Sequence, residues 1–150
     1  MKLSWTNFKI SIAGAKLIHL VQKDKIWDHG SMAEQAKTIF LMIQKAHSPL
    51  GIESLKRHCM TGYFDNVKAT LDKEGIFIEN PVVKEVAVLE VKPGKGERPD
   101  MFTALISGIS INDKTFHGIK FSVEMCFARE GQWWMLTAIK RWSNHKTLIT

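Results

Sequence analysis

The chain has 150 residues, of which 45% are hydrophobic and 24% are charged, and it contains only two cysteines. These values are typical of one globular domain and exclude a collagen, a disulfide-rich scaffold and a wholly disordered chain. No run of about 18 uncharged apolar residues occurs, so no conventional membrane-spanning helix is predicted. The net charge of +6 favours an anionic partner, such as lipid headgroups, RNA or an acidic protein, or else a lysine-rich surface that aids solubility.

The first apolar stretch, residues 8–21, has the features of neither a secretory signal nor a mitochondrial transit peptide. It is interrupted by Lys9, Lys16 and His19, no small-residue cleavage site follows it, and the first arginine is Arg57. The two cysteines form no CxxC motif and are expected to be buried free thiols in a reducing compartment. We therefore expect a cytoplasmic protein, with peripheral association with the inner membrane as a further hypothesis.

The first predicted helix covers residues 6–25. Lysines recur every seven residues at positions 2, 9, 16 and 23, which places them along one side of a helix. A broad apolar face accompanies them, formed by Trp5, Phe8, Ile12, Ala15 and Ile18. Such a face predicts either insertion into an anionic membrane surface or packing over the sheet.

The second predicted helix begins at a capping box, with Ser31 at the N-cap and Glu34 at the third helical position. Its apolar stripe has helical spacing and consists of Met32, Ala36, Ile39, Phe40, Ile43 and Ala46. Leu41 stands alone on the opposite, polar face. A short helix is expected over residues 52–59, and another over residues 63–74, capped by Thr61, with an apolar stripe of Tyr63, Phe64, Val67 and Leu71.

Strand periodicity dominates the second half of the chain. Strands are predicted over residues 82–92, 101–111, 116–129 and 133–142, separated by turn-forming residues. The third strand alternates most clearly, with one apolar face made of Ile119, Phe121, Val123, Met125 and Phe127. A two-residue turn at Glu130 and Gly131 predicts three cross-strand pairs, which are Phe127 with Trp134, Met125 with Leu136, and Val123 with Ala138. Trp133 is then expected on the opposite face.

Helices followed by strands predict an α+β fold, in which N-terminal helices pack on a four-stranded antiparallel sheet. No strong catalytic motif accompanies this pattern, because HExxH, GxSxG and a complete P-loop are all absent from the sequence. The six histidines have no metal-ligand spacing, and no acid–base pair of carboxylates stands out. We therefore predict a protein that is not an enzyme and has no cofactor, no catalytic residues and no metal site.

Three packing patterns carry a resemblance to a known family. They are the helix over residues 36–46, the run Ile52-Glu53-Ser54-Leu55, and the spacing of Trp134, Leu136 and Ile139 in the last strand. With these patterns, residues 27–142 resemble the C-terminal domain of the mitochondrial inner-membrane import-motor tether, the forty-four-kilodalton translocase subunit, and its bacterial relatives. That family lies within the nuclear-transport-factor-two-like superfamily. The chain departs from the family at His47, where an aromatic residue is common.

The resemblance implies a strongly bent, cone-shaped sheet and a non-enzymatic binding or scaffold module that works at a membrane or on a protein partner. It implies an N-terminal amphipathic helix over residues 1–26 and an import-tether-like cone domain over residues 27–150. The residues expected to contact a membrane or partner are Trp5, Phe8, Lys9, Ile12, Lys16, Leu41 and Trp133. A hydrophobic pocket for an acyl chain or other apolar ligand is expected to be lined by Phe40, Ile43, Phe64, Val67, Phe121, Val123, Met125, Phe127, Trp134 and Leu136.

Three alternatives remain open at the level of sequence. A ligand-binding or isomerase-like enzyme of the same superfold would need a carboxylate and a hydrogen-bond donor in an apolar cavity. An RNA- or ribosome-binding module is suggested by residues 140–146, which combine cations with one aromatic residue. A homodimer through the outer face of the sheet is suggested by analogy with related cones.

Overall fold

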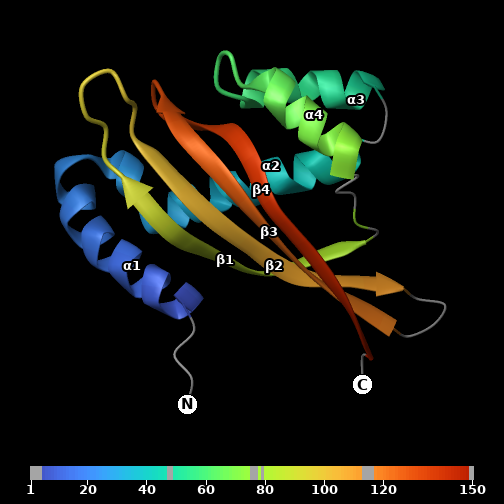
Figure 1. Ribbon diagram of the computed structural model, residues 1–150. Coiled ribbons are helices and arrows are strands. Elements are labelled where there is room, and N and C mark those ends of the chain that lie inside the picture. The colour runs from blue at the N-terminus through green and yellow to red at the C-terminus, as the bar shows by residue number, and fades with distance from the viewer. Residues whose placement is uncertain (1–4, 47–48, 75–77, 79, 113–116, 149–150) are drawn as a thin grey trace.

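The computed structural model describes residues 5–46, 49–74, 78, 80–112 and 117–148, with side chains left out at residues 49, 74, 112, 117 and 141–148. In these residues four α-helices precede four strands (Figure 1). The helices are α1 (Trp5–Lys23), α2 (His29–Lys45), α3 (Pro49–Ser54) and α4 (Phe64–Glu74), with 3-10 turns η1 (Lys25–Trp27) and η2 (Leu55–His58). The strands are β1 (Pro81–Lys92), β2 (Met101–Asn112), β3 (His117–Glu130) and β4 (Trp133–Leu148). The predicted α+β class is confirmed.

The four strands form one antiparallel sheet in the order β1-β2-β3-β4. The long strands curve across the molecule, α1 lies beside β1, α2 crosses the sheet, and α3 and α4 lie together near one end (Figure 1). Register shifts interrupt the β1–β2 and β3–β4 ladders. Such bulges bend a strand and increase its twist, which accounts for the curled sheet.

The predicted register between β3 and β4 is wrong by two residues. Glu130 pairs with Trp133, so the hairpin turn consists of Gly131 and Gln132, and Phe127 faces Leu136. Gly131 has φ 66, and glycine adopts this left-handed conformation without the steric cost of a Cβ. Bulges then shift the pairing further, and the other two predicted pairs are replaced by Met125 with Ile139 and Val123 with Trp142.

A two-residue shift leaves the faces of a strand unchanged, because side chains alternate with a period of two. The predicted inward face of β3 is therefore correct from Phe121 to Phe127, whose four inward side chains are at most 3% exposed. The predicted separation of the two tryptophans is confirmed as well, since Trp134 is 1% exposed and Trp133 is 67% exposed.

Helix α2 supplies the other half of the core. The predicted apolar stripe is buried throughout, and the ring of Phe40 stacks on that of Phe121 with a centroid distance of 5.4 Å. Burial of such large apolar side chains contributes about 1.5–3 kcal/mol each. The contact between α2 and the inward face of the sheet is therefore a main source of stability for this fold.

The predicted capping box at the start of α2 is wrong. The helix begins at His29, and the carboxylate of Asp28 accepts a hydrogen bond from the backbone N–H of Ser31 at 2.9 Å. The Ser31 hydroxyl instead accepts a hydrogen bond from the side-chain amide of Gln35. Aspartate serves well at this position because its negative charge also interacts favourably with the positive end of the helix dipole.

The connection after α2 differs from the prediction in two respects. The single helix expected over residues 52–59 is divided into α3 and η2. Thr61 was expected to cap the next helix, but its hydroxyl donates a hydrogen bond to Glu130 on β3, and α4 begins at Phe64. Tyr63 lies outside the buried stripe of α4 and is 40% exposed.

Helix α1 packs on β1 through Ala13 and Leu17, which belong to the same buried cluster as the residues of α2 and the sheet. The predicted division after residue 26 therefore does not separate two hydrophobic cores. The end of α1 is tied to the hairpin, because Arg129 forms ion pairs with Asp24 and Asp100 and donates a hydrogen bond to the Gly131 carbonyl.

The Asp24–Arg129 ion pair predicts a pH-dependent contribution to stability. Hydrogen bonds from Arg129 and from the Ile26 backbone hold the pKa of Asp24 below its ordinary value. A carboxyl whose pKa is lowered on folding stabilises the protein above its unfolded pKa and loses this contribution as the pH falls through the folded pKa. We expect Asp24→Asn to lower the urea midpoint at pH 7 and to have a progressively smaller effect as the pH falls below the ordinary aspartate pKa of about 3.9.

An equal change of charge elsewhere provides the control for this experiment. Asp72 is exposed on α4, and Asp72→Asn removes the same charge from a side chain outside the Arg129 network. The midpoint of this variant is expected to stay close to that of the wild type at both pH values. If the urea midpoints of Asp24→Asn and the wild type differed by the same amount at low pH as at pH 7, the pH-dependent role of the Asp24–Arg129 ion pair would be contradicted.

Candidate functional site

The strongest candidate for a binding surface is one side of α1, here called the α1 face and defined as Trp5, Phe8, Lys9, Ile12 and Lys16. Residues 5, 8 and 12 are spaced by three and four positions, which aligns their side chains in one stripe along a helix. Although α1 is docked on β1, Trp5, Phe8 and Ile12 are 68%, 51% and 43% exposed. The helix therefore uses one side for the core and keeps a second apolar side on the surface.

The side chains of the α1 face are arranged against one another. The rings of Trp5 and Phe8 stack with a centroid distance of 5.3 Å, and the Lys9 ammonium lies 5.8 Å from the Trp5 ring centroid. That distance is typical of a cation–π interaction. Two aromatic rings and an adjacent cation thus form one continuous patch.

A shallow groove of about 300 Å³ runs between the α1 face and β1. Its β1 side is formed by Leu89, Glu90 and Val91, and the α1 side includes Lys9 and Lys16. Helix α1 itself has three lysines and no acidic residue. The groove therefore has an apolar interior with cations along its helical side.

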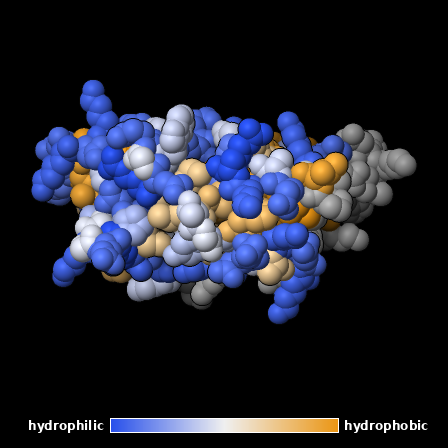
Figure 2. Space-filling model, turned by 90° about the horizontal axis from the view of Figure 1, so that it is seen from above, coloured by the Kyte–Doolittle hydropathy of each residue, from blue (hydrophilic) through white to orange (hydrophobic). Residues whose placement is uncertain are grey.

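Apolar side chains also reach the surface outside α1. The view from above shows orange and pale orange patches among blue polar side chains (Figure 2). Leu50, Val82 and Trp133 are each more than a third exposed, but they lie on different elements. Among the described residues, three such side chains share one stripe only on the α1 face. Single exposed apolar residues are normal on protein surfaces, whereas a contiguous patch marks an interaction site.

The predicted contact residues do not all lie on one surface. Five of them form the α1 face, whereas Leu41 is half-buried against the core and Trp133 lies on β4. Leu41 is thus better placed for packing than for contact with a membrane or partner.

The residues predicted to line an internal pocket are packed together as core. All ten are at most 9% exposed, and among them only Trp134 borders either of the two described grooves. The inward face of the sheet is filled by the side chains of α2 and α4 and by aromatic pairs such as Phe102 with Phe127. Interiors packed in this way have few voids larger than a water molecule, so these residues stabilise the fold.

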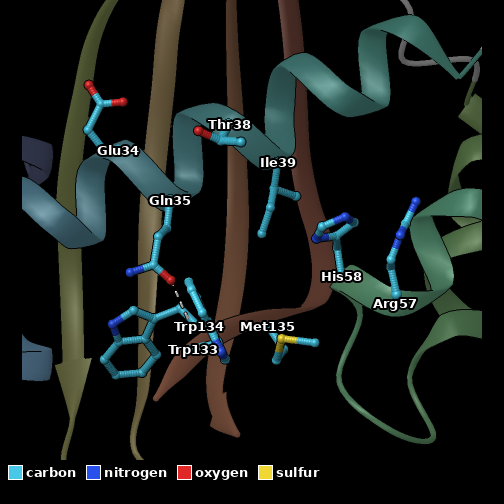
Figure 3. Close-up of a pocket in the computed structure, with 9 residues that line it drawn as sticks. All are labelled: Glu34, Gln35, Thr38, Ile39, Arg57, His58, Trp133, Trp134 and Met135. Atoms are coloured by element: carbon cyan, nitrogen blue, oxygen red, sulfur yellow. Dashed lines mark hydrogen bonds between the residues drawn. The ribbon is translucent and has the colours of Figure 1, made fainter. Parts of the chain in front are cut away.

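A second, larger groove of about 490 Å³ lies at the edge of the sheet where α2 and η2 approach β4 (Figure 3). We call it the β4 groove. Its lining is mainly apolar and consists of Glu34, Gln35, Thr38, Ile39, Arg57, His58, Trp133, Trp134 and Met135.

The walls of the β4 groove are held by hydrogen bonds from three elements. The side-chain carbonyl of Gln35 accepts from the Trp134 backbone N–H at 3.1 Å, and the Trp134 indole N–H donates to the Ile26 carbonyl at 3.1 Å. Beside them, the Met60 N–H donates to the Leu136 carbonyl at 2.9 Å. These bonds pair backbone groups at the edge of β4 that have no neighbouring strand. They hold α2 and the segment after η2 against β4.

Two polar side chains of the β4 groove, Arg57 and His58, come from η2, beside those of α2. Burial and the neighbouring Arg57 charge lower the pKa of His58, so its imidazole is predominantly neutral at pH 7 and can donate and accept hydrogen bonds. The sequence did not point to Arg57, His58 or Met135, because η2 and β4 are far apart along the chain. The prediction that Trp133 lies on the face opposite to Trp134 was the one signal in the sequence that pointed to this region.

Other reactive groups offer no second site in the described residues. Burial raises the pKa of the Cys59 thiol to about 11, which leaves it protonated and unreactive at neutral pH. No three His, Cys, Asp or Glu side chains of the described chain converge as metal ligands would. Of the cations predicted for RNA binding, Lys140 is exposed on β4, and the side chains of the others lie outside the described part of the chain.

Comparisons of the chain with protein-family models, with curated proteins and with solved structures found no match. Within the described residues, every helix is too short or too polar to cross a bilayer. The α1 face and the β4 groove are therefore the surfaces from which a function can be inferred.

Proposed function

We propose that the protein is a peripheral membrane-binding module that places the α1 face in the interface of an anionic bilayer. The exposed stripe of Trp5, Phe8 and Ile12 beside Lys9 and Lys16 is the observation that supports this function. Tryptophan favours the headgroup region of bilayers because its ring is both apolar and able to donate a hydrogen bond. Lysines at the same depth meet the anionic headgroups.

The energies involved are sufficient for reversible binding. Full burial of a large apolar side chain contributes about 1.5–3 kcal/mol, and each lysine close to an anionic surface about 1 kcal/mol. Several such residues on one stripe add up to a useful affinity, whereas a single exposed residue such as Trp133 does not. The absence of acidic residues from α1 avoids repulsion from the headgroups.

Co-sedimentation with vesicles tests the proposed function. We expect binding to vesicles that contain phosphatidylserine, and much weaker binding to phosphatidylcholine alone or at high salt, where charges are screened. The double variant Trp5→Ala, Phe8→Ala is expected to bind at least about tenfold more weakly. Reversal of charge with Lys9→Glu and Lys16→Glu is expected to abolish the preference for anionic lipid.

Trp133→Ala is the matched control, because Trp133 and Trp5 are equally exposed but lie on different elements. This variant is expected to bind vesicles like the wild type. Equal absence of binding to anionic and neutral vesicles would refute the proposal, as would an equal loss of binding in Trp133→Ala and Trp5→Ala.

A role at a membrane agrees with what the resemblance of residues 27–142 to the import-tether family implies. Membership of that family, a protein partner in import, and a homodimer stay predictions. The isomerase-like alternative has no support in the described residues, because neither groove combines a buried carboxylate with a facing donor.

A further inference from the structure

The β4 groove has the size and the lining of a small-molecule site. Its volume of about 490 Å³ lies within the roughly 300–1,000 Å³ of typical ligand pockets. Such pockets are mainly apolar with a few polar groups that orient the ligand. The apolar part here is formed by Ile39, Trp134 and Met135, while polar groups come both from α2 and from Arg57 and His58 on η2.

Two features of the apolar part favour an aromatic ligand. The Trp133 ring lines the groove while being 67% exposed, so one face of the indole is available for stacking. Met135 lines the same groove, and a thioether makes favourable contacts with aromatic rings. The close-up shows Trp133 and Met135 below α2, with His58 and Arg57 on the opposite side from Trp133 (Figure 3).

The charge at the η2 end of the groove, where Arg57 lies, favours an anion. No described carboxylate forms an ion pair with Arg57. Glu34 also lines the groove, but it extends from α2 on the far side from η2 (Figure 3). The guanidinium of arginine matches a carboxylate in geometry as well as in charge. Next to it, His58 supplies a second polar contact at the same end.

We propose that the β4 groove binds a planar aromatic carboxylate. The ring of the ligand lies against Trp133 and Met135, and its carboxylate is directed to Arg57 and His58. This site is separate from the α1 face and does not depend on membrane binding.

Titration with 2-naphthoate, followed by the tryptophan fluorescence and by calorimetry, tests the proposal. We expect saturable binding of one molecule per chain, at least about tenfold tighter than that of the uncharged 2-naphthylmethanol. Decanoate, which has the charge but no ring, is expected to bind at least about fivefold more weakly than 2-naphthoate. Trp133→Leu is expected to remove most of that preference for the aromatic acid.

Arg57→Gln is expected to weaken 2-naphthoate binding by about five- to tenfold. Lys56→Gln is the matched control, since Lys56 is the exposed neighbour on η2 and does not line the groove, and this variant is expected to bind like the wild type. Thermal unfolding of both variants checks that the fold is retained. The proposal is overturned if Arg57→Gln and Lys56→Gln bind alike, or if decanoate and 2-naphthoate bind equally.

The α1 variants keep this result distinct from the proposed function. The double variant Trp5→Ala, Phe8→Ala is expected to bind 2-naphthoate with unchanged affinity. Loss of 2-naphthoate binding in that variant would place the ligand on the α1 face and would refute the β4 groove as its site.

Discussion

Replacement of Trp134 by alanine is expected to lower the free energy of unfolding by about 3–5 kcal/mol. Trp134 is 1% exposed and lies edge-on to Trp27 and Phe102, with centroid distances of 5.1 and 4.8 Å. Its removal leaves a cavity next to Trp27 of η1 and Phe102 of β2. It also leaves the Ile26 carbonyl without its indole donor. Domains of this kind are stable by only about 5–15 kcal/mol in total, so the effect is a large part of the whole.

Two further variants separate the effect of burial from the effect of the indole hydrogen bond. Trp133→Ala makes the same chemical change at the neighbouring position, but its side chain is on the surface, and we expect a change within about 0.5 kcal/mol. Trp134→Phe keeps an aromatic ring in the core and removes the indole N–H, so an intermediate loss is expected. Urea unfolding of the three variants measures these differences. Equal losses in Trp133→Ala and Trp134→Ala would contradict the burial of Trp134 and the exposure of Trp133.

Gly108→Ala is expected to destabilise the protein by about 3 kcal/mol, at the upper end of what overpacking usually costs. A Cβ at this position would overlap the carbonyl oxygen of Val82 and would lie 3.0 Å from the ring of Phe121. The obstacle on the β1 side is backbone, which cannot turn aside as a flexible side chain can. Strands β1 and β2 would have to separate next to the bulge that follows Val83.

The same substitution in α1 should have the opposite sign. A Cβ on Gly14 would meet nothing within 4 Å, and alanine is favoured over glycine inside a helix by about 1 kcal/mol. We therefore expect Gly14→Ala to raise the thermal midpoint and Gly108→Ala to lower it. If Gly108→Ala left the midpoint unchanged or raised it, the close approach of β1 to Gly108 would be refuted.

The α1 face was predictable from the sequence in its composition but not in its exposure. The spacing of Trp5, Phe8 and Ile12 predicts one stripe, and that stripe was compatible either with the core or with a membrane. The structure places Ala13 and Leu17 on the side that packs on β1, which leaves the aromatic stripe at the surface. A helix with apolar residues on two sides can bury only one of them on a single sheet edge, and the sequence pattern does not say which.

The β4 groove could not have been predicted. Arg57 and His58 belong to η2, whereas Trp133 and Met135 belong to β4, and the two segments meet because Met60 and Leu136 are hydrogen-bonded. No local pattern encodes such a contact between residues more than seventy positions apart. The residues expected to line an internal pocket are a related case, since periodicity identifies inward residues but does not show whether their combined volume fills the interior.

The sequence by itself determined the class of the fold, the eight main elements, and which face of α2 and of β3 is buried. These properties follow from the period of the apolar residues, 3.6 in helices and two in strands, which any local segment carries. Only the tertiary structure decided the β3–β4 register, the Asp28 cap, the side of α1 that remains exposed, and the residues that meet in the β4 groove. These depend on turn conformation, side-chain volume and contacts distant in sequence, which are settled only when the whole chain packs.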